Sequence, residues 1–73
     1  MEKIEINAGH YLELMDRLHI IASNLDEHCV EHPLAQSDKE IKFRIEYALG
    51  QVLDAYQYVG QKEFENENEN NTH

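Results

Sequence analysis

The sequence predicts an all-α fold: an antiparallel two-helix hairpin with a short extended N-terminal arm, which dimerises into a four-helix bundle. Two stretches of the 73 residues carry apolar side chains at alternating intervals of three and four. Pro33 separates these stretches, and the five residues PLAQS connect them. This spacing places apolar side chains on one face of a helix, and a short connection favours antiparallel neighbours, so the hairpin is the simplest topology.

The predicted arm consists of residues 1–7, MEKIEIN. Within it, KIEI at residues 3–6 alternates polar and apolar residues as strands do, but it is too short to be stable alone. Two structures fit this pattern: an arm that packs Ile4 and Ile6 onto the bundle, or a strand that pairs with the dimer mate or with a target's sheet edge. The arm lacks the apolar centre of a signal peptide and the chain has a single cysteine, so we expect a cytoplasmic protein.

The first helix is expected to begin after Asn7, because an asparagine side chain can accept hydrogen bonds from the first turn. It is expected to end near His32, because Pro33 disfavours helix at the residue before it. Its predicted core stripe consists of Tyr11, Leu14, Leu18, Ile21 and Leu25. Met15, Ala22 and Cys29 widen that stripe on one side, which suits a bundle better than a two-stranded coiled coil.

The second helix is expected to begin at Ser37, with Glu40 completing a capping box. Gly60 is its predicted C-terminal stop, because glycine commonly ends helices. The predicted core stripe of this helix contains Ile41, Ile45, Val52 and Val59, with Ala48 and Ala55 between them. The helical hairpin domain is therefore predicted to span residues 8–62.

Residues 63–73, EFENENENNTH, form a predicted disordered acidic tail, because Phe64 is their only apolar side chain. The domain that remains is marginal as a monomer, and one cysteine cannot form an internal disulfide. Two apolar stripes this wide also need a further layer to cover them. We therefore expect a homodimer.

Fifteen acidic residues against six basic ones give a formal net charge of −9. Binding to nucleic-acid phosphates or to an anionic membrane surface needs clustered lysine and arginine, so we expect neither direct nucleic-acid binding nor membrane binding. No apolar run approaches the roughly 20 residues of a membrane span. The charge is compatible with a partner protein that has a basic surface.

The segment DEHCVEHP, residues 26–33, concentrates two histidines, a cysteine and three carboxylates. His28 and His32 are four residues apart, so both imidazoles can face one point, which is half of a zinc site. Cys29 lies about 100° round the helix from His28, so it is poorly placed for either ligation or catalysis. We expect no cofactor and no catalytic residue here. The two histidines extend the apolar stripe toward the turn, and the alternative is a metal- or pH-responsive regulator that uses both.

Phe43 and Tyr47 are four residues apart and form one ridge, with Gly50 just beyond it and Glu46 beside it. An exposed aromatic ridge among charged residues is typical of a protein-binding hot spot. The ridge either binds a partner, or packs on the dimer mate or under the arm. In each case it marks an interface.

The acidic face of the first helix completes the predicted partner-binding set with Glu13, Asp16, Glu27 and Glu31. Together with Asp26, these residues approach the repeated carboxylates of a DNA mimic, but Arg17 interrupts them. An ordinary solvated helix face gives a similar pattern. A steering surface for a basic target is the interpretation we prefer.

We therefore expect a non-enzymatic protein-binding module. Small, acidic, tail-bearing chains with one cysteine are common among accessory proteins of phages and mobile elements, so we expect one that inhibits or modulates a host protein. Nucleic-acid-binding proteins and defence proteins of the host are candidate targets of such an inhibitor. Besides the regulator that uses His28 and His32, the alternative is a structural subunit of a larger assembly.

Overall fold

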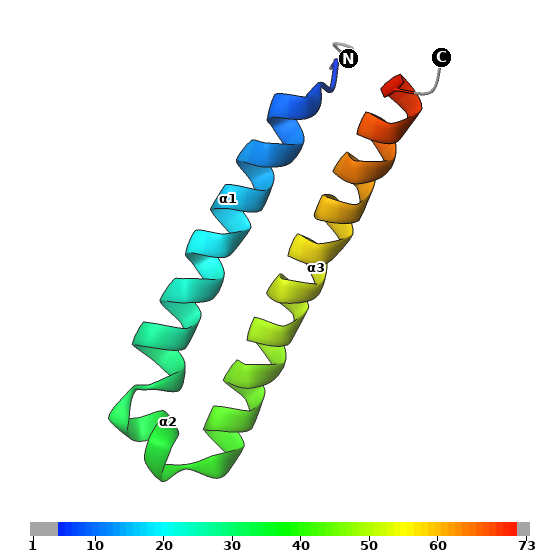
Figure 1. Cartoon of the computed structure of the whole chain (residues 1–73). Coiled ribbons are helices and arrows are strands. Elements are labelled where there is room, and N and C mark those ends of the chain that lie inside the picture. Colours follow the sequence, from blue (N-terminus) through cyan, green and yellow to red (C-terminus); the bar gives the residue numbers. More distant parts are fainter. Residues whose placement is uncertain (1–4, 72–73) are drawn as a thin grey trace.

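The computed structural model describes residues 5–71, with side chains described for residues 5–65. Its elements in chain order are α1 (Ala8–Asn24), the π-helix η1 (Leu25–Val30), α2 (Pro33–Ser37) and α3 (Lys39–Asn71). The two long helices, α1 and α3, lie side by side and run in opposite directions, and α2 lies at the end where they are connected (Figure 1). Residues 5–71 contain no strand, so the predicted all-α class is confirmed.

The start of α1 follows from local hydrogen bonds around Asn7. The Asn7 side chain accepts a hydrogen bond from the backbone N of His10 at 3.2 Å, which confirms Asn7 as the cap. His10 Nδ1 accepts one in return from the backbone N of Asn7 at 3.0 Å. The histidine thus takes the place that glutamate or glutamine usually has in a capping box. Before this cap, residues 5–7 have no regular structure, and Ile4 lies outside the described residues.

The first long helix ends in a π-helical turn, which the sequence spacing does not predict. Within η1 the backbone hydrogen bonds reach back five residues, as from Glu31 N to Asp26 O at 3.2 Å. The side chain of Gln36 donates to the backbone oxygen of Val30 at 2.6 Å, which satisfies a carbonyl group at the end of η1. His32 then has an extended backbone, so the predicted end of the helix near this residue is confirmed.

The connection PLAQS is the short helix α2 rather than a plain turn. Pro33 is its first residue, where a missing N–H costs nothing, and His32 Nδ1 accepts from the backbone N of Leu34 at 3.1 Å. The prediction that Ser37 caps the next helix is wrong, because its hydroxyl donates to the Leu34 carbonyl at 3.0 Å. Asp38 is the cap of α3, and its Oδ1 accepts from the backbone N atoms of Glu40 at 3.0 Å and Ile41 at 3.2 Å.

The predicted end of the second helix at Gly60 is wrong, since α3 continues to Asn71. No glycine among the described residues has a positive φ, so Gly60 has ordinary helical backbone and not the left-handed cap. A Cβ atom at Gly60 would lie 3.1 Å from the terminal methyl group of Met15, so the glycine allows a close approach of the two long helices. The helix thus extends into residues 63–71, where disorder was expected. The four glutamates in this segment are good helix formers.

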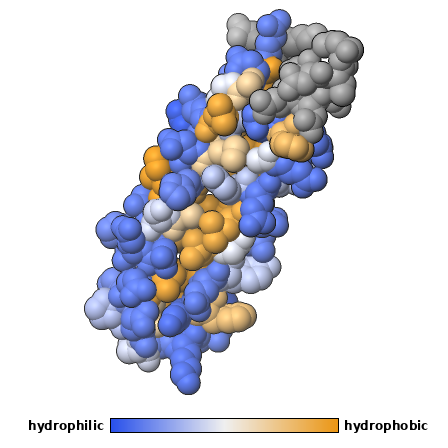
Figure 2. Space-filling view, viewed as in Figure 1, coloured by the Kyte–Doolittle hydropathy of each residue, from blue (hydrophilic) through white to orange (hydrophobic). Residues whose placement is uncertain are grey.

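The core of this pair of helices is one narrow stripe. Ala22, Val30 and Ala35 are the fully buried apolar residues in the described part, at 6%, 7% and 1% exposure. The contact stripe of the first long helix consists of Tyr11, Met15, Leu18, Ala22, Leu25 and Cys29. On α3 the contact stripe consists of Ile41, Ile45, Leu49, Val52, Tyr56 and Val59. On the face shown in Figure 2, apolar side chains form a band between the two helices.

Leu14 and Ile21 belong to the predicted core stripe but are not covered within the chain, where they are 47% and 48% exposed. Met15 and Ala22, one residue further along, take the central positions. A single neighbouring helix covers only one stripe, and a small alanine at its centre lets the backbones approach. The other predicted core residues of the first helix, Tyr11, Leu18 and Leu25, are partly buried, as are Ile41, Ile45, Val52 and Val59 of α3.

Candidate protein-binding surface

The predicted aromatic ridge, Phe43 and Tyr47, lies on the outer side of α3. Each of the two residues follows a contact residue, Ile41 or Ile45, by two positions, which places it about 200° round the helix and away from α1. Their side chains are 64% and 65% exposed. Within residues 5–65, no other segment buries either ring.

The ridge borders a shallow depression of about 420 Å³, lined by Glu40, Phe43, Arg44 and Tyr47. At its edge Arg44 Nε donates to Glu40 Oε1 at 2.9 Å, in an ion pair that is exposed to solvent. A Cβ atom at Gly50 would meet nothing within 4 Å, so the surface just beyond Tyr47 is open. Two aromatic rings beside a shallow depression, with an ion pair at its edge, form a surface that an apolar side chain of a partner can contact.

The predicted acidic residues lie along the other long helix. Glu13, Asp16, Glu27 and Glu31 are all exposed, and each is two positions from a contact residue of α1 or η1. Helical periodicity turns Glu13 and Glu27 away from α3. Asp16 directly follows Met15 and lines a depression together with Tyr56 of α3. Arg17 pairs with Glu13 at 3.5 Å, so a base interrupts this acidic face, as the sequence indicates.

The structure does not bring the two halves of the predicted binding set together. α1 and α3 lie side by side, so their outer sides point in opposite directions (Figure 1). Phe43 and Tyr47 lie on the outer side of α3 and Glu13 lies on the outer side of α1, while Asp16 lies beside the contact between the two helices. Glu46 is exposed on the same helix as the ridge. The acidic residues of α1 can therefore act on a partner at the ridge through long-range attraction only.

The two histidines of DEHCVEHP line a small depression of about 170 Å³ at the connected end of the helices. Its lining consists of His28, Cys29, His32, Leu34, Ala35, Ile41 and Ile45. Cys29, expected to point away from the histidines, lies beside the same depression. His32 Nδ1 accepts a hydrogen bond from the backbone N of Leu34, so in the neutral ring the proton is on Nε2 and neither nitrogen has a free lone pair for a metal ion. Among the side chains that the structure describes, in residues 5–65, no three of the ligand type gather closely enough to hold a metal ion.

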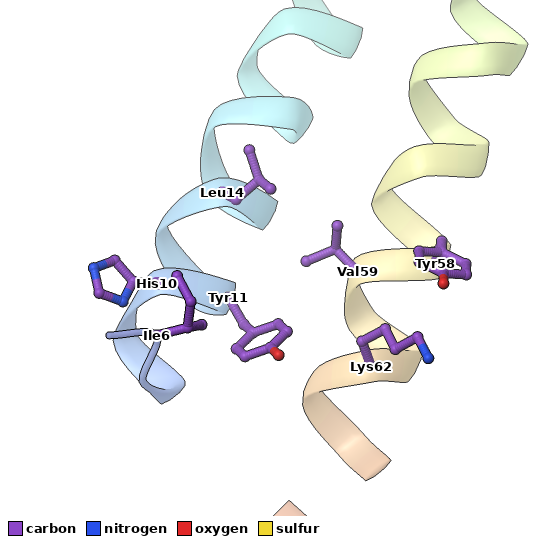
Figure 3. Close-up of a pocket in the computed structure, with 7 residues that line it drawn as sticks. All are labelled: Ile6, His10, Tyr11, Leu14, Tyr58, Val59 and Lys62. Carbon is purple, nitrogen blue, oxygen red and sulfur yellow. The ribbon is translucent and has the colours of Figure 1, made fainter. Parts of the chain in front are cut away.

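A further depression, of about 250 Å³, lies at the open end of the helix pair and was missed by sequence reasoning (Figure 3). Its lining consists of Ile6, His10, Tyr11, Leu14, Tyr58, Val59 and Lys62. Tyr11 from α1 and Val59 from α3 point toward one another across it, and Leu14 lies above them on α1 (Figure 3). The Lys62 ammonium lies 5.5 Å from the centre of the Tyr58 ring, a cation–π contact. The apolar Ile6 next to the Asn7 cap is the signal that could have indicated this depression.

None of the helices in residues 5–71 combines the length and the apolar character needed to cross a bilayer. Comparison with known proteins found no matching family model, no matching curated protein and no matching solved structure.

Proposed function

We propose that this chain is a small acidic protein-binding module without enzymatic activity, which pairs as a homodimeric four-helix bundle. In this proposal it is an accessory protein of a phage or mobile element that inhibits or modulates a cytoplasmic host protein. The observation that carries the proposal is the exposed Phe43–Tyr47 ridge on the outer side of α3. A large apolar surface kept in water on a regular helix favours a partner as its cover.

The ridge has the physical properties of a binding hot spot. Two rings four residues apart on one helix are held by a rigid scaffold, so little conformational freedom is lost when a partner covers them. If each ring loses roughly 100 Å² of exposed apolar surface, burial contributes about 2.5 kcal/mol per ring at 25 cal/mol per Å². Truncation of such a ring usually costs about 2 kcal/mol or more.

The net charge of −9 favours a partner with a basic surface. The acidic residues of α1 lie away from the ridge, so they contribute to the approach of the partner and not to the contact itself. The proposal therefore predicts that the rate of association with the partner falls as the salt concentration increases, and that the rate of dissociation changes less. Glu40, Glu46 and Arg44, which are near the ridge, would set the local pairing.

The test is affinity capture from bacterial lysate at several salt concentrations, followed by calorimetry with the purified partner. The chain offers a matched control, because Phe64 is an aromatic residue of similar exposure, 61%, far along α3 from the ridge. Wild type and Phe64→Ala are expected to bind the same protein, and the double variant Phe43→Ala/Tyr47→Ala to lose it by about 30-fold or more, corresponding to about 2 kcal/mol. Equal capture by all three, or no partner at any salt concentration, contradicts the proposal.

A second candidate is a metal- or pH-responsive regulator, which is favoured by one observation: His28, Cys29 and His32 line a common depression. Zinc titration by calorimetry, together with melting at pH 5.5 and 7.5, separates it from the first proposal. A stoichiometric zinc isotherm that is lost in His28→Ala would support the regulator. A structural subunit of a larger assembly would instead be indicated by light scattering, as large or ill-defined masses in place of a discrete dimer.

A further inference from the structure

The pair of long helices is a single layer whose two flat sides are both open. The molecule measures 55 × 29 × 17 Å, and its radius of gyration is 16.5 Å. A compact chain of this length has a radius of gyration of about 11 Å. One helix with its side chains is about 10–12 Å across, so the smallest dimension leaves no room for a second layer within the chain.

The exposed surface area indicates how large an interface this chain could form. The chain exposes 6184 Å². A compact monomer of 8.6 kDa exposes roughly 4,700 Å², so this chain exposes roughly 1,500 Å² more. A standard protein interface buries about 800 Å² on each partner. The excess is therefore large enough for one such interface on a flat side, with surface remaining for the ridge.

The two flat sides lie on either side of the contact stripe. We call one of them the Leu14 face; it consists of Leu14 and Ile21 on α1 and Ala48 and Ala55 on α3. Leu14 and Ile21 are seven residues apart, as are the two alanines, so each pair follows one side of its helix. Tyr58, three residues beyond Ala55, lines the same depression as Leu14, which links the two helices on this side (Figure 3).

The opposite side is the Leu53 face, which consists of Leu12, His19, Leu49 and Leu53. Leu12 is two positions before Leu14, and Leu53 is two positions before Ala55, so helical periodicity separates the faces. Two depressions on this side share His19, one with Leu12 and the other with Leu49 and Leu53. Both faces carry exposed leucine or isoleucine, so apolar surface alone does not select between them.

The charged residues distinguish the Leu14 face from the Leu53 face. The depression on the Leu14 face has no carboxylate in its lining, and Lys62 is its one charged residue. On the Leu53 face, Asp16 lines one depression and Asp26 lines the other. In a chain of net charge −9, pairing two Leu53 faces would bring the aspartates of both copies together in a desolvated interface. Pairing two Leu14 faces keeps them apart.

Side-chain size also favours the Leu14 face. Its α1 half carries the large residues Leu14 and Ile21, and its α3 half carries the small residues Ala48 and Ala55. Ala48 is exposed and Ala55 partly buried within one chain. When two such faces meet about a two-fold axis, large residues of one copy can enter the space above the alanines of the other, which allows the helices to approach closely.

We propose that a second copy of this chain docks on the Leu14 face, so that two single layers form the four-helix bundle. This inference rests on the dimer of the proposed function and specifies which side it uses. The interface is isologous: Leu14, Ile21, Ala48 and Ala55 of both copies form it. Phe43 and Tyr47 lie on the outer edge of α3, so the dimer presents two ridges and binds two partner molecules.

The test measures the mass of the full chain in solution by light scattering for matched charge variants. Leu14→Glu and Ile21→Glu are expected to shift the chain from dimer to monomer, with a dissociation constant raised at least 100-fold. The controls Leu53→Glu and Leu12→Glu carry the same substitution at side chains that are 43% and 57% exposed on the other face. They are expected to remain dimeric.

A second measurement covers the possibility that a separated monomer loses its helices. A photo-crosslinking residue placed at position 14 or 21 is expected to give covalent dimers, and one placed at position 53 or 12 is not. Crosslinking from position 53 or 12 alone, or dissociation by Leu53→Glu but not by Leu14→Glu, overturns the choice of face while the dimer stands. A wild-type chain that stays monomeric at all concentrations overturns the dimer itself, and the ridge is still tested by its own alanine variants.

Discussion

Replacing Gly60 with alanine tests where α3 ends, because the two possible backbones at this residue predict opposite effects on stability. In the structure Gly60 is an interior residue of a helix, and alanine there gains about 1 kcal/mol of helix propensity over glycine. The new Cβ would lie 3.1 Å from the terminal methyl group of Met15. Methionine is flexible and can move by a few tenths of an ångström, so we expect a net gain of about 0.5 kcal/mol.

Gly50→Ala is the matched control for this change. Gly50 is also inside α3, but a Cβ atom there would meet nothing within 4 Å. It should therefore show the full gain of about 1 kcal/mol. The assay is urea and thermal unfolding followed by circular dichroism, at one fixed protein concentration because dimerisation adds a concentration-dependent term. For a domain of this size, 1 kcal/mol corresponds to about 4–8 °C in Tm.

The sign of the stability change in Gly60→Ala distinguishes the two backbones. If α3 ended there with a left-handed glycine, as the sequence pattern predicts, alanine would be strained and would cost about 1 kcal/mol or more. A loss of stability in Gly60→Ala that persists when Met15 is also replaced by alanine, together with a stabilised Gly50→Ala protein, would refute the continuation of α3 through this residue, because the Met15 methyl group then no longer opposes the new Cβ. Equal gains at both positions would mean that Met15 yields without cost.

Three further predictions concern the caps and the histidines. Asp38→Ala is expected to lower the free energy of unfolding by about 1 kcal/mol, because two backbone N–H groups of α3 lose their acceptor. Ser37→Ala is expected to cost less. If Ser37 were the cap, urea unfolding would show the larger loss for Ser37→Ala. His32→Ala is expected to lower the free energy of unfolding by about 0.5–2 kcal/mol. His32→Asn is expected to recover most of this loss, since an asparagine side chain also accepts a hydrogen bond from the backbone N–H two residues further on. Equal losses for both variants in thermal melts would show that the His32 ring stabilises the chain by packing and not as a cap. Zinc is expected to leave Tm unchanged in thermal-shift measurements, because Nδ1 of His32 is engaged as an acceptor and Nε2 of the neutral ring carries the proton. A rise in Tm that disappears in His28→Ala would contradict this.

Much of the local structure could be predicted from short stretches of sequence. The Asn7 cap and the helix end before Pro33 involve residues within four positions of one another, so the information is contained in the stretch itself. The same reasoning fails at Ser37. Serine and aspartate are both good caps, and the choice of Asp38 follows from α2, whose last turn engages the serine hydroxyl.

The candidate binding surface was only partly predictable for a related reason. Spacing alone groups Phe43 with Tyr47, since residues four apart on a helix are neighbours. The placement of the ridge relative to the acidic residues depends on which side of each helix meets the other. That choice is made by Met15 and Ala22, which pack at the centre of the contact where Leu14 and Ile21 were expected.

By itself, then, the sequence determined the helical class, the capped start of the first helix, its end before the proline and the strongly acidic charge, because each depends on composition or on residues close in the chain. Only the tertiary structure decided that α3 continues past Gly60, that the aromatic ridge and the acidic residues of α1 lie apart, and that Leu14 and Ile21 are uncovered. The last two of these have the same physical reason. A single neighbouring helix covers one stripe of side chains, and which stripe it covers depends on how closely the two backbones can approach.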